Sequence, residues 1–338
     1  MVSIKEVAQY AGVSTMTVSR VVNETGYVSA KTKERVLAVI SETGYKVNQT
    51  AVGLRTGKTN SIGVIISDIA NPFFAFILKG IDHRCSQNNH DTILFNTDED
   101  PDKELRYIDL LRQKSVRGII ISSCISDYKK DKDVFADLTP IFFNRLPTGI
   151  DADAVLNDNA KDGYLAAEYL IKTGHRRIAF INGNPEMSTF KERYLGFQNA
   201  MKKHEIPVSE ELIINGDYSI EGGYRSTEKI FNASITPDAI IPANNFMTQG
   251  MYNYLKANNI NVPEDISVVG HGDYDWCSFV DPPLTVLEHR RLEMGKQAAG
   301  ILMERLERNT CNSFRKVILE PKFVIRHSVK NYERSAQQ

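Results

Sequence analysis

The spacing of apolar residues predicts a helical segment at the start of the chain. Across residues 4–44, apolar side chains recur every three to four positions, which is the period of an α-helix. Serines that can cap a helix stand at positions 3, 14 and 29, and Gly12 and Gly44 follow the first and third stretches as helix-ending residues. The expected apolar stripes are Ile4, Val7, Ala8 and Ala11; then Val18, Val21 and Val22; then Val36, Leu37 and Ile40. Three short helices around a glycine-containing turn predict a helix-turn-helix module.

The pattern changes from Ser61 onward, where short β-branched runs alternate with amphipathic stretches of helical length. This alternation predicts parallel sheets covered by helices on both faces, which is a doubly wound α/β fold. Enzymes, receptors and sensors all use such folds, so the fold does not decide the function. The expected strands are residues 61–66, 92–96, 118–122, 141–144, 154–158, 177–183, 238–244 and 267–270.

Composition narrows the class of protein. With 42% hydrophobic and 25% charged residues, the 338-residue chain is of ordinary globular type. No apolar run approaches the ~18 residues of a membrane-spanning helix, so we expect no membrane partner. The N-terminus carries acidic and polar residues where a secretory signal would be apolar, which predicts a cytoplasmic protein. The four cysteines are far apart and lack C-x-x-C spacing, so we expect neither disulfides nor a structural metal.

The near-neutral net charge of −1 hides a segregation of charge. Residues 1–58 hold eight cationic side chains and four glutamates, a net charge of +4, which leaves −5 on the remaining 280 residues. This asymmetry indicates an anionic partner for the helical module, although a solvated helical face would give the same count.

The second predicted helix has the side chains that reading a DNA major groove requires. Arg20 can make a bidentate contact to guanine, and Thr15 and Met16 can meet a thymine methyl or a base edge. The alternative is a small helical bundle with ordinary polar faces. The side chains suited to phosphate oxygens are Ser14, Thr17, Asn23 and Ser29.

A family resemblance extends through nearly the whole chain. The first 48 residues contain the string IKEVAQYAGVSTMTVSRVVNETGYVSAKTKERVLAVISETGYKVN, and later anchors include DIANPFFAFILKGI, IKTGHRRIAFING, VPEDISVVG and DPPLTV. Together they resemble the lactose-repressor/galactose-repressor (LacI/GalR) family of bacterial transcription factors. The resemblance implies a helix-turn-helix headpiece followed by a periplasmic-binding-protein-like sensor of two doubly wound lobes.

Domain boundaries follow from this resemblance. The expected parts are a headpiece at 1–48, a hinge or linker at 49–60, a sensor and dimerisation domain at 61–330 and a tail at 331–338. Within the sensor, the resemblance assigns the N-lobe to about 61–159 and 290–318, and the C-lobe to about 160–289 and 319–328.

The linker sequence, QTAVGLRTGKTN, lacks a full apolar face and is rich in glycine, threonine and cations. An isolated chain should be poorly helical here, and a flexible tether is the simpler interpretation. In the family, this segment folds into a hinge helix on DNA and inserts a leucine from each of two subunits into the minor groove. Leu54 occupies the matching position, and Arg55 can enter the same groove.

Candidate effector residues follow the predicted strands. Ligands of open α/β sheets bind beyond the carboxyl ends of the strands, where the loops converge. Aromatic side chains there can stack on a sugar ring while polar ones bind its hydroxyls, and core or rim residues are the alternative. Arg193 and Asn244 match positions that family members use for ligand oxygens. The full set is Asp68, Asn71, Phe73, Phe74, Asn144, Arg145, Thr189, Arg193, Tyr218, Asn244, Asp273 and Trp276.

Two departures from the family pattern bear on the effector. The chain reads Gly270, His271, Gly272, Asp273 where many members have two consecutive aspartates, and Asn144 replaces a further aspartate. If the cleft arginines, and His271 with them, lack carboxylate partners, an anionic effector such as a sugar acid or sugar phosphate is expected. The alternative is that a carboxylate neutralises these cations, and the candidates are Asp68, Asp273 and Asp275.

Other functions have weaker support. The chain has no nucleotide-binding, nucleophile-elbow or zinc-protease motif, and its seven histidines are dispersed, so we expect no enzyme, cofactor or metal site. A transport-type solute-binding protein would share the sensor architecture but would need an export signal and no basic headpiece.

Two headpieces reading two half-sites predict a homodimer on a pseudo-palindromic double-stranded operator. Residues 290–306 form an amphipathic stretch that suits either the dimer interface or the lobe core. The end of the chain has no leucine heptads, which favours a dimer over a tetramer. Family members include induced and co-repressed proteins and some that need a partner protein, and the sequence leaves these open.

Overall fold

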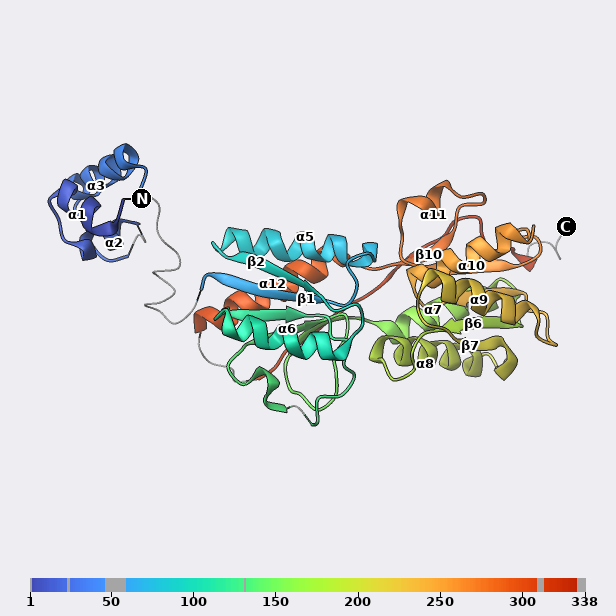
Figure 1. The fold of residues 1–338 in the computed structure, drawn as a ribbon. Helices are drawn as coiled ribbons and strands as arrows, with labels where there is room; N and C mark the ends of the chain where they lie inside the picture. Colours follow the sequence, from blue (N-terminus) through green and yellow to red (C-terminus); the bar gives the residue numbers. More distant parts are fainter. Residues whose placement is uncertain (1, 23–24, 46–58, 131, 309–312, 333–338) are drawn as a thin grey trace. The chain divides into compact units, whose positions relative to one another are not determined.

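The computed structural model describes residues 2–22, 25–45, 59–130, 132–308 and 313–332. Internal contacts divide the chain into two compact units, Met1–Asn60 and Ser61–Gln338 (Figure 1).

The first unit is a bundle of three helices, as the apolar spacing predicts. These are α1 (Ile4–Ala11), α2 (Thr15–Val22) and α3 (Ala30–Thr43). Ser3 and Glu6 form the expected capping box at α1, and left-handed glycines end α1 and α3. The shared core consists of Val7, Ala8, Ala11, Val18, Val21 and Val36.

One core prediction is wrong in this unit. Leu37 is 45% exposed, whereas Val36 is fully buried. Adjacent residues of a helix point about 100° apart, and the core covers only the face that carries Val36.

The second unit contains two six-stranded sheets, one in each lobe (Figure 1). The N-lobe sheet has the order β11-β5-β4-β3-β1-β2, and the C-lobe sheet has the order β12-β10-β9-β8-β6-β7. All described strand pairs are parallel except β10 with β12. The N-lobe strands are β1 (Ser61–Ile66), β2 (Asp91–Asn96), β3 (Gly118–Ile121), β4 (Pro140–Phe143), β5 (Asp153–Asn157) and β11 (Lys316–Leu319). The C-lobe strands are β6 (Ile178–Asn182), β7 (Ile213–Asn215), β8 (Ala239–Pro242), β9 (Ser267–His271), β10 (Thr285–Glu288) and β12 (Lys322–Val324).

Helices cover both faces of each sheet. In the N-lobe, α5 (Pro72–Gln87) and α12 (Arg291–Arg308) pack on one face and α6 (Pro101–Gln113) packs on the other. The buried side of α12 is therefore lobe core, which is the simpler of the two predicted roles for that stretch. The C-lobe helices are α7 (Asn159–Lys172), α8 (Ser188–Lys203), α9 (Ile220–Phe231), α10 (Asn245–Ala257) and the short α11 (Asp275–Phe279).

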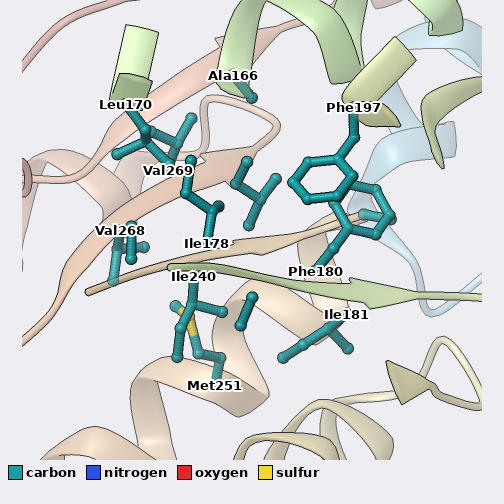
Figure 2. Close-up of a cluster of buried hydrophobic side chains, with 14 of the residues drawn as sticks. Ala166, Leu170, Ile178, Phe180, Ile181, Phe197, Ile240, Met251, Val268 and Val269 are labelled. Carbon is teal, nitrogen blue, oxygen red and sulfur yellow. The ribbon is translucent and has the colours of Figure 1, made fainter. Parts of the chain in front are cut away.

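The C-lobe core lies between the sheet and these helices. Figure 2 shows Leu170 of α7, Phe197 of α8 and Met251 of α10 against side chains of the central strands. Helices α7 and α8 approach closely, because a Cβ on Gly163 would lie 1.8 Å from the Arg193 carbonyl and one on Gly196 would lie 1.9 Å from that of Ala160. This contact sets the position of α8 and of the side chains on its first turns.

Candidate functional site

The outward face of α2 carries the predicted base-reading side chains. Val18 and Val21 hold the helix on its core, so that Met16 is left 64% exposed and Arg20 is exposed as well. The Ser14 hydroxyl accepts from the Thr17 amide at 3.1 Å, which fixes the start of the helix.

Two serines predicted for phosphate contact also act as helix caps. Ser14 stands before α2, and the Ser29 hydroxyl at the start of α3 accepts from the Thr32 amide at 3.3 Å. Tyr27, which the sequence did not single out, is 89% exposed between α2 and α3. The predicted DNA-contacting residues that lie outside the described residues are Asn23, Leu54 and Arg55.

A cavity in the second unit is lined from both lobes, where the carboxyl ends of the strands meet. Ten of the twelve predicted effector residues line it. From the N-lobe these are Asp68, Asn71, Phe73, Phe74, Asn144 and Arg145, and from the C-lobe they are Thr189, Arg193, Tyr218 and Asn244. His271, which the sequence suggested for the cleft, also lines it. Further lining residues that the sequence did not single out are Ser67, Glu99, Phe190, Asn245, Phe246, Gly272, Tyr274 and His289.

The other two predicted residues, Asp273 and Trp276, do not line this cavity. The Asp273 carboxylate accepts two hydrogen bonds from Arg326, both at 2.8 Å. The Trp276 ring lies 6.2 Å from that of Tyr252, on the C-lobe core. The cause is Gly272, whose φ of +82° turns the chain after β9 and whose missing side chain makes room for the ring of Tyr274. Tyr274 therefore lines the cavity, where we had predicted Asp273 and Trp276 instead.

The N-lobe wall contains a buried ion pair. Arg145 donates from Nη1 and Nη2 to the two carboxylate oxygens of Glu99, at 2.7 and 2.8 Å. Burial would lower the pKa of the Arg145 guanidinium, but Glu99 outweighs burial and raises it. Glu99 and Asn144 both have left-handed backbones, with φ of 59° and 63°, and each such residue costs about 1 kcal/mol or more. Strained residues of this kind concentrate at functional sites.

The C-lobe wall contains a second buried ion pair. Arg193 Nε lies 3.3 Å from Asp162 Oδ2, and its Nη1 donates to the Ala243 carbonyl at 2.5 Å. His289 Nε2 donates to the same Asp162 oxygen at 2.7 Å. Burial would raise the pKa of Asp162, but His289 and then Arg193 hold it at about 2. Asp162 is therefore ionised and holds both Arg193 and His289 in place.

His271 lies in the same wall as a neutral group. Its Nδ1 donates to the Pro242 carbonyl at 2.6 Å, and its Nε2 is buried without a hydrogen-bond partner among the described residues. Burial, together with the charge of Arg193, lowers the pKa of His271 to about 3. The ring therefore presents no positive charge to the cavity at neutral pH.

These contacts correct the expected charge balance of the cleft. Arg145 and Arg193 both have carboxylate partners, so the premise of unpaired buried cations is wrong. The partners are Glu99 and Asp162, and none of the three aspartates that we considered, Asp68, Asp273 and Asp275, supplies one among the described residues.

Contacts between side chains of the two lobes lie beside the cavity. Asn245 Nδ2, on α10, donates at 2.9 Å to Asn71 Oδ1, which also accepts from the Phe73 amide and caps α5. The Arg291 guanidinium lies 5.0 Å from the ring centre of Phe76 and 4.5 Å from that of Tyr274. The arrangement of the lobes thus depends on side chains at the edge of the cavity.

Metal sites and membrane spans are both absent from the described residues. No group of three or more His, Cys, Asp or Glu side chains there is placed to hold a metal ion. No helix in that part of the chain is both long and apolar enough to cross a membrane.

Comparison with known proteins places the chain in a family. Residues 3–48 match the family model of bacterial regulatory proteins, lacI family, and residues 59–327 match that of periplasmic binding proteins and the sugar-binding domain of the LacI family. The chain belongs to the LacI family. A curated relative, the HTH-type transcriptional repressor PurR of Haemophilus influenzae (strain PittEE), is 32% identical over 336 residues, covering 98% of this chain and 99% of the relative.

Another relative of this LacI-family protein is the ribose operon repressor of Haemophilus influenzae, which is 29% identical over 97% of the chain and 99% of the relative. Among solved structures, the lac repressor dimer bound to operator and the anti-inducer ONPF has a TM-score of 0.85 at 26% identity, covering 97% of this chain and 99% of that one. The complex of the transcriptional regulator CelR with cellobiose has a TM-score of 0.72 at 27% identity, covering 97% and 100%. This LacI-family protein is thus an effector-controlled, DNA-binding transcriptional repressor and not an enzyme.

Proposed function

We propose that this repressor binds a pseudo-palindromic operator as a homodimer and that a small sugar-like molecule in the cleft between the lobes controls that binding. The cavity lined from both lobes is the observation that carries the proposal, because a ligand contacting both walls changes the relative free energies of different lobe arrangements. The domain boundaries given above, and a cytoplasmic location where a repressor meets its operator, belong to the same proposal.

The chemistry of the cavity supports a hydroxyl-rich ring as effector. The Phe190 and Tyr218 rings are stacked, with centres 5.8 Å apart and an angle of 12° between their planes. Flat aromatic faces suit a sugar ring, and the amides of Asn71 and Asn244 supply polar groups for hydroxyls. One of the similar solved structures is a complex of CelR with cellobiose, and one of the relatives is named the ribose operon repressor. The sequence also suggested a sugar acid or phosphate, but that suggestion loses its premise, because both cleft arginines have carboxylate partners.

Exposed apolar side chains on the N-lobe support the homodimer. Ile69, Phe76 and Leu94 are 60%, 49% and 39% exposed, and β2 is an edge strand of its sheet. Apolar surface of this kind is stabilised by contact with a partner. A solved lac repressor, similar over nearly the whole chain, is a dimer on operator DNA.

A single titration tests the proposed function. The full-length protein is added to a labelled palindromic duplex, with and without each sugar of a panel, and the fluorescence anisotropy is recorded at several salt concentrations. We expect salt-sensitive binding at a stoichiometry of two chains per duplex and a change in affinity with at least one sugar. Binding of one chain per duplex, or indifference to every sugar that binds the protein, would contradict the proposal.

A further inference from the structure

The ion pair on the N-lobe wall has no net charge. Arg145 and Glu99 share two parallel hydrogen bonds, and their side chains are only 9% and 16% exposed. Arg145 Nη1 also approaches the Ser123 carbonyl at 3.3 Å. Both residues line the cavity, so a ligand meets a guanidinium whose charge is already balanced by a carboxylate.

The surrounding chain holds this pair in place before any ligand arrives. Asp98 and Glu99 both have left-handed backbones, with φ of 55° and 59°, and the Glu99 amide donates to the Ser67 carbonyl at 3.1 Å. On the other side, the buried Glu104 carboxylate accepts from the Ser123 hydroxyl at 2.6 Å and from the Cys124 amide at 2.7 Å. A pair built from strained and buried groups does not separate without cost.

The other charges of the cavity do not favour an anion. Arg193 and His289 both lie against Asp162, and His271 is hydrogen-bonded as a neutral ring. Asp68 lines the cavity and has no cationic partner among the described residues; its Oδ1 accepts from the Ala70 amide at 2.8 Å. A carboxylate or phosphate entering the cavity would therefore meet two arginines that are already paired and one unpaired aspartate.

We propose that Glu99 determines the effector specificity of the cleft: by holding Arg145, it makes the site accept a neutral, hydroxyl-rich effector and reject the corresponding carboxylate or phosphate. This inference rests on the cleft being the effector site. Hydroxyls can donate to the remaining lone pairs of Glu99 and accept from N–H groups. An anion must instead displace Glu99 from Arg145, which leaves a partly buried carboxylate without its partner.

The test compares the wild type with Glu99→Gln in the full-length protein. Gln has nearly the shape of Glu but no charge, so Arg145 becomes available to an anion. The probes are matched pairs, namely galactose and galacturonate, glucose and glucuronate, and ribose and ribose 5-phosphate, together with sulfate against chloride at constant ionic strength. Binding is measured by calorimetry and by the shift in Tm. Glu186→Gln, which removes an exposed charge from outside the cavity, is the matched control.

We expect the wild type to bind the neutral member of each pair more tightly. Its Tm should be no higher in sulfate than in chloride. Glu99→Gln should bind the acids or sulfate about tenfold or more tightly than the wild type, since an unpaired buried guanidinium gains a charge-assisted hydrogen bond. The Glu99→Gln/Arg145→Gln double variant should lose this gain, and Glu186→Gln should behave as the wild type does.

The inference is overturned if the wild type binds the acids more tightly than their neutral partners. It is also overturned if folded Glu99→Gln binds no anion more tightly than the wild type does. Comparing the acids with their neutral partners on the wild type tests the inference even if Glu99→Gln does not fold. Sulfate binding that appears in Glu99→Gln alone, with no sugar bound by either protein, would support the role of Glu99 while contradicting the sugar-like effector.

Discussion

Individual side chains differ in how far the sequence predicts their environment. The period of α2 separates buried Val18 from Met16, which is 64% exposed, so the exposed face of α2 is predictable from local spacing. The carboxylate partners of the cleft arginines are not predictable from local spacing. Glu99 precedes Arg145 by 46 positions, and only the arrangement of the strands brings the two together. The same limit explains Asp273, which the sequence placed in the cavity and the structure places against Arg326.

Arg20 should carry much of the base specificity. Replacing Arg20 with alanine removes the one cation on the exposed face of α2, so we expect operator affinity to fall by about 1–3 kcal/mol and base preference to relax. Anisotropy titrations against an operator and its base-substituted variants measure both effects. Arg35→Ala, which removes a cation from α3, should weaken binding to all sequences about equally, and an equal loss of specificity in both variants would contradict the assignment.

His271 should make the protein sensitive to acid. Its pKa falls from 6.5 to about 3 on folding, so the unfolded chain binds the proton more readily between these values. Stability from this group is therefore present above pH 6.5 and is lost as the pH falls toward 3. His271→Asn, which keeps a donor for the Pro242 carbonyl, should flatten the decline of Tm over this range. An unchanged pH profile would show that His271 does not contribute.

At the scale of elements, the longer runs were predictable and the shortest were not. The eight runs picked out from β-branched residues correspond to β1 to β6, β8 and β9. The apolar pattern did not pick out β7, β10, β11 and β12, which have only three or four residues each. Most residues of β7, β11 and β12 are at least partly exposed, whereas three of the four residues of β10 are buried. Strands β11 and β12 complete one sheet each, so their assignment depends on partners far away in the sequence.

The close contact of α7 with α8 leads to a prediction about the cleft. A Cβ at Gly196 would lie 1.9 Å from the Ala160 carbonyl, so Gly196→Ala must move α8 and with it Arg193. We expect a lower Tm and weaker effector binding, with operator binding by the folded protein retained. Gly300→Ala in α12 is the matched control, since the nearest atom is Arg84 Nε at 3.9 Å. That variant should be neutral or more stable by up to ~1 kcal/mol. Equal tolerance of both substitutions would contradict the packing described for α7 and α8.

On the scale of the whole molecule, the repressor joins a cationic N-terminal part, which contains the DNA-binding headpiece, to a two-lobed sensor of opposite net charge. The +4 of residues 1–58 and the −5 of the remainder cancel in the overall charge of −1, so the average concealed the DNA-binding part. Within the sensor, the polar contacts beside the cavity connect both lobes, and these contacts are the physical means by which a ligand can alter the lobe arrangement.

The Asn245 to Asn71 hydrogen bond should contribute to this coupling. Asn245→Ala removes a bond that crosses between the lobes, so we expect effector affinity to change by about fivefold, the equivalent of a net hydrogen-bond free energy of about 1 kcal/mol. Asn258→Ala removes a comparable bond at the other end of α10, within one lobe, and should leave the affinity unchanged. Calorimetry on both variants measures the difference, and identical effects would mean that the bond between the lobes has no special role.

We propose that an effector in the cleft controls DNA binding, and that the two activities use different residues. Leu54 of the linker serves operator binding, and Arg193 of the cleft serves the response to effector. The most direct measurement is operator affinity with and without a bound effector in the wild type, Leu54→Ala and Arg193→Ala. We predict that Leu54→Ala weakens operator binding at least tenfold while binding effector normally, because the proposed wedge of Leu54 between base steps would be lost. Arg193→Ala should bind operator normally and lose the response to effector. Equal loss of both activities in either variant would contradict this division of roles.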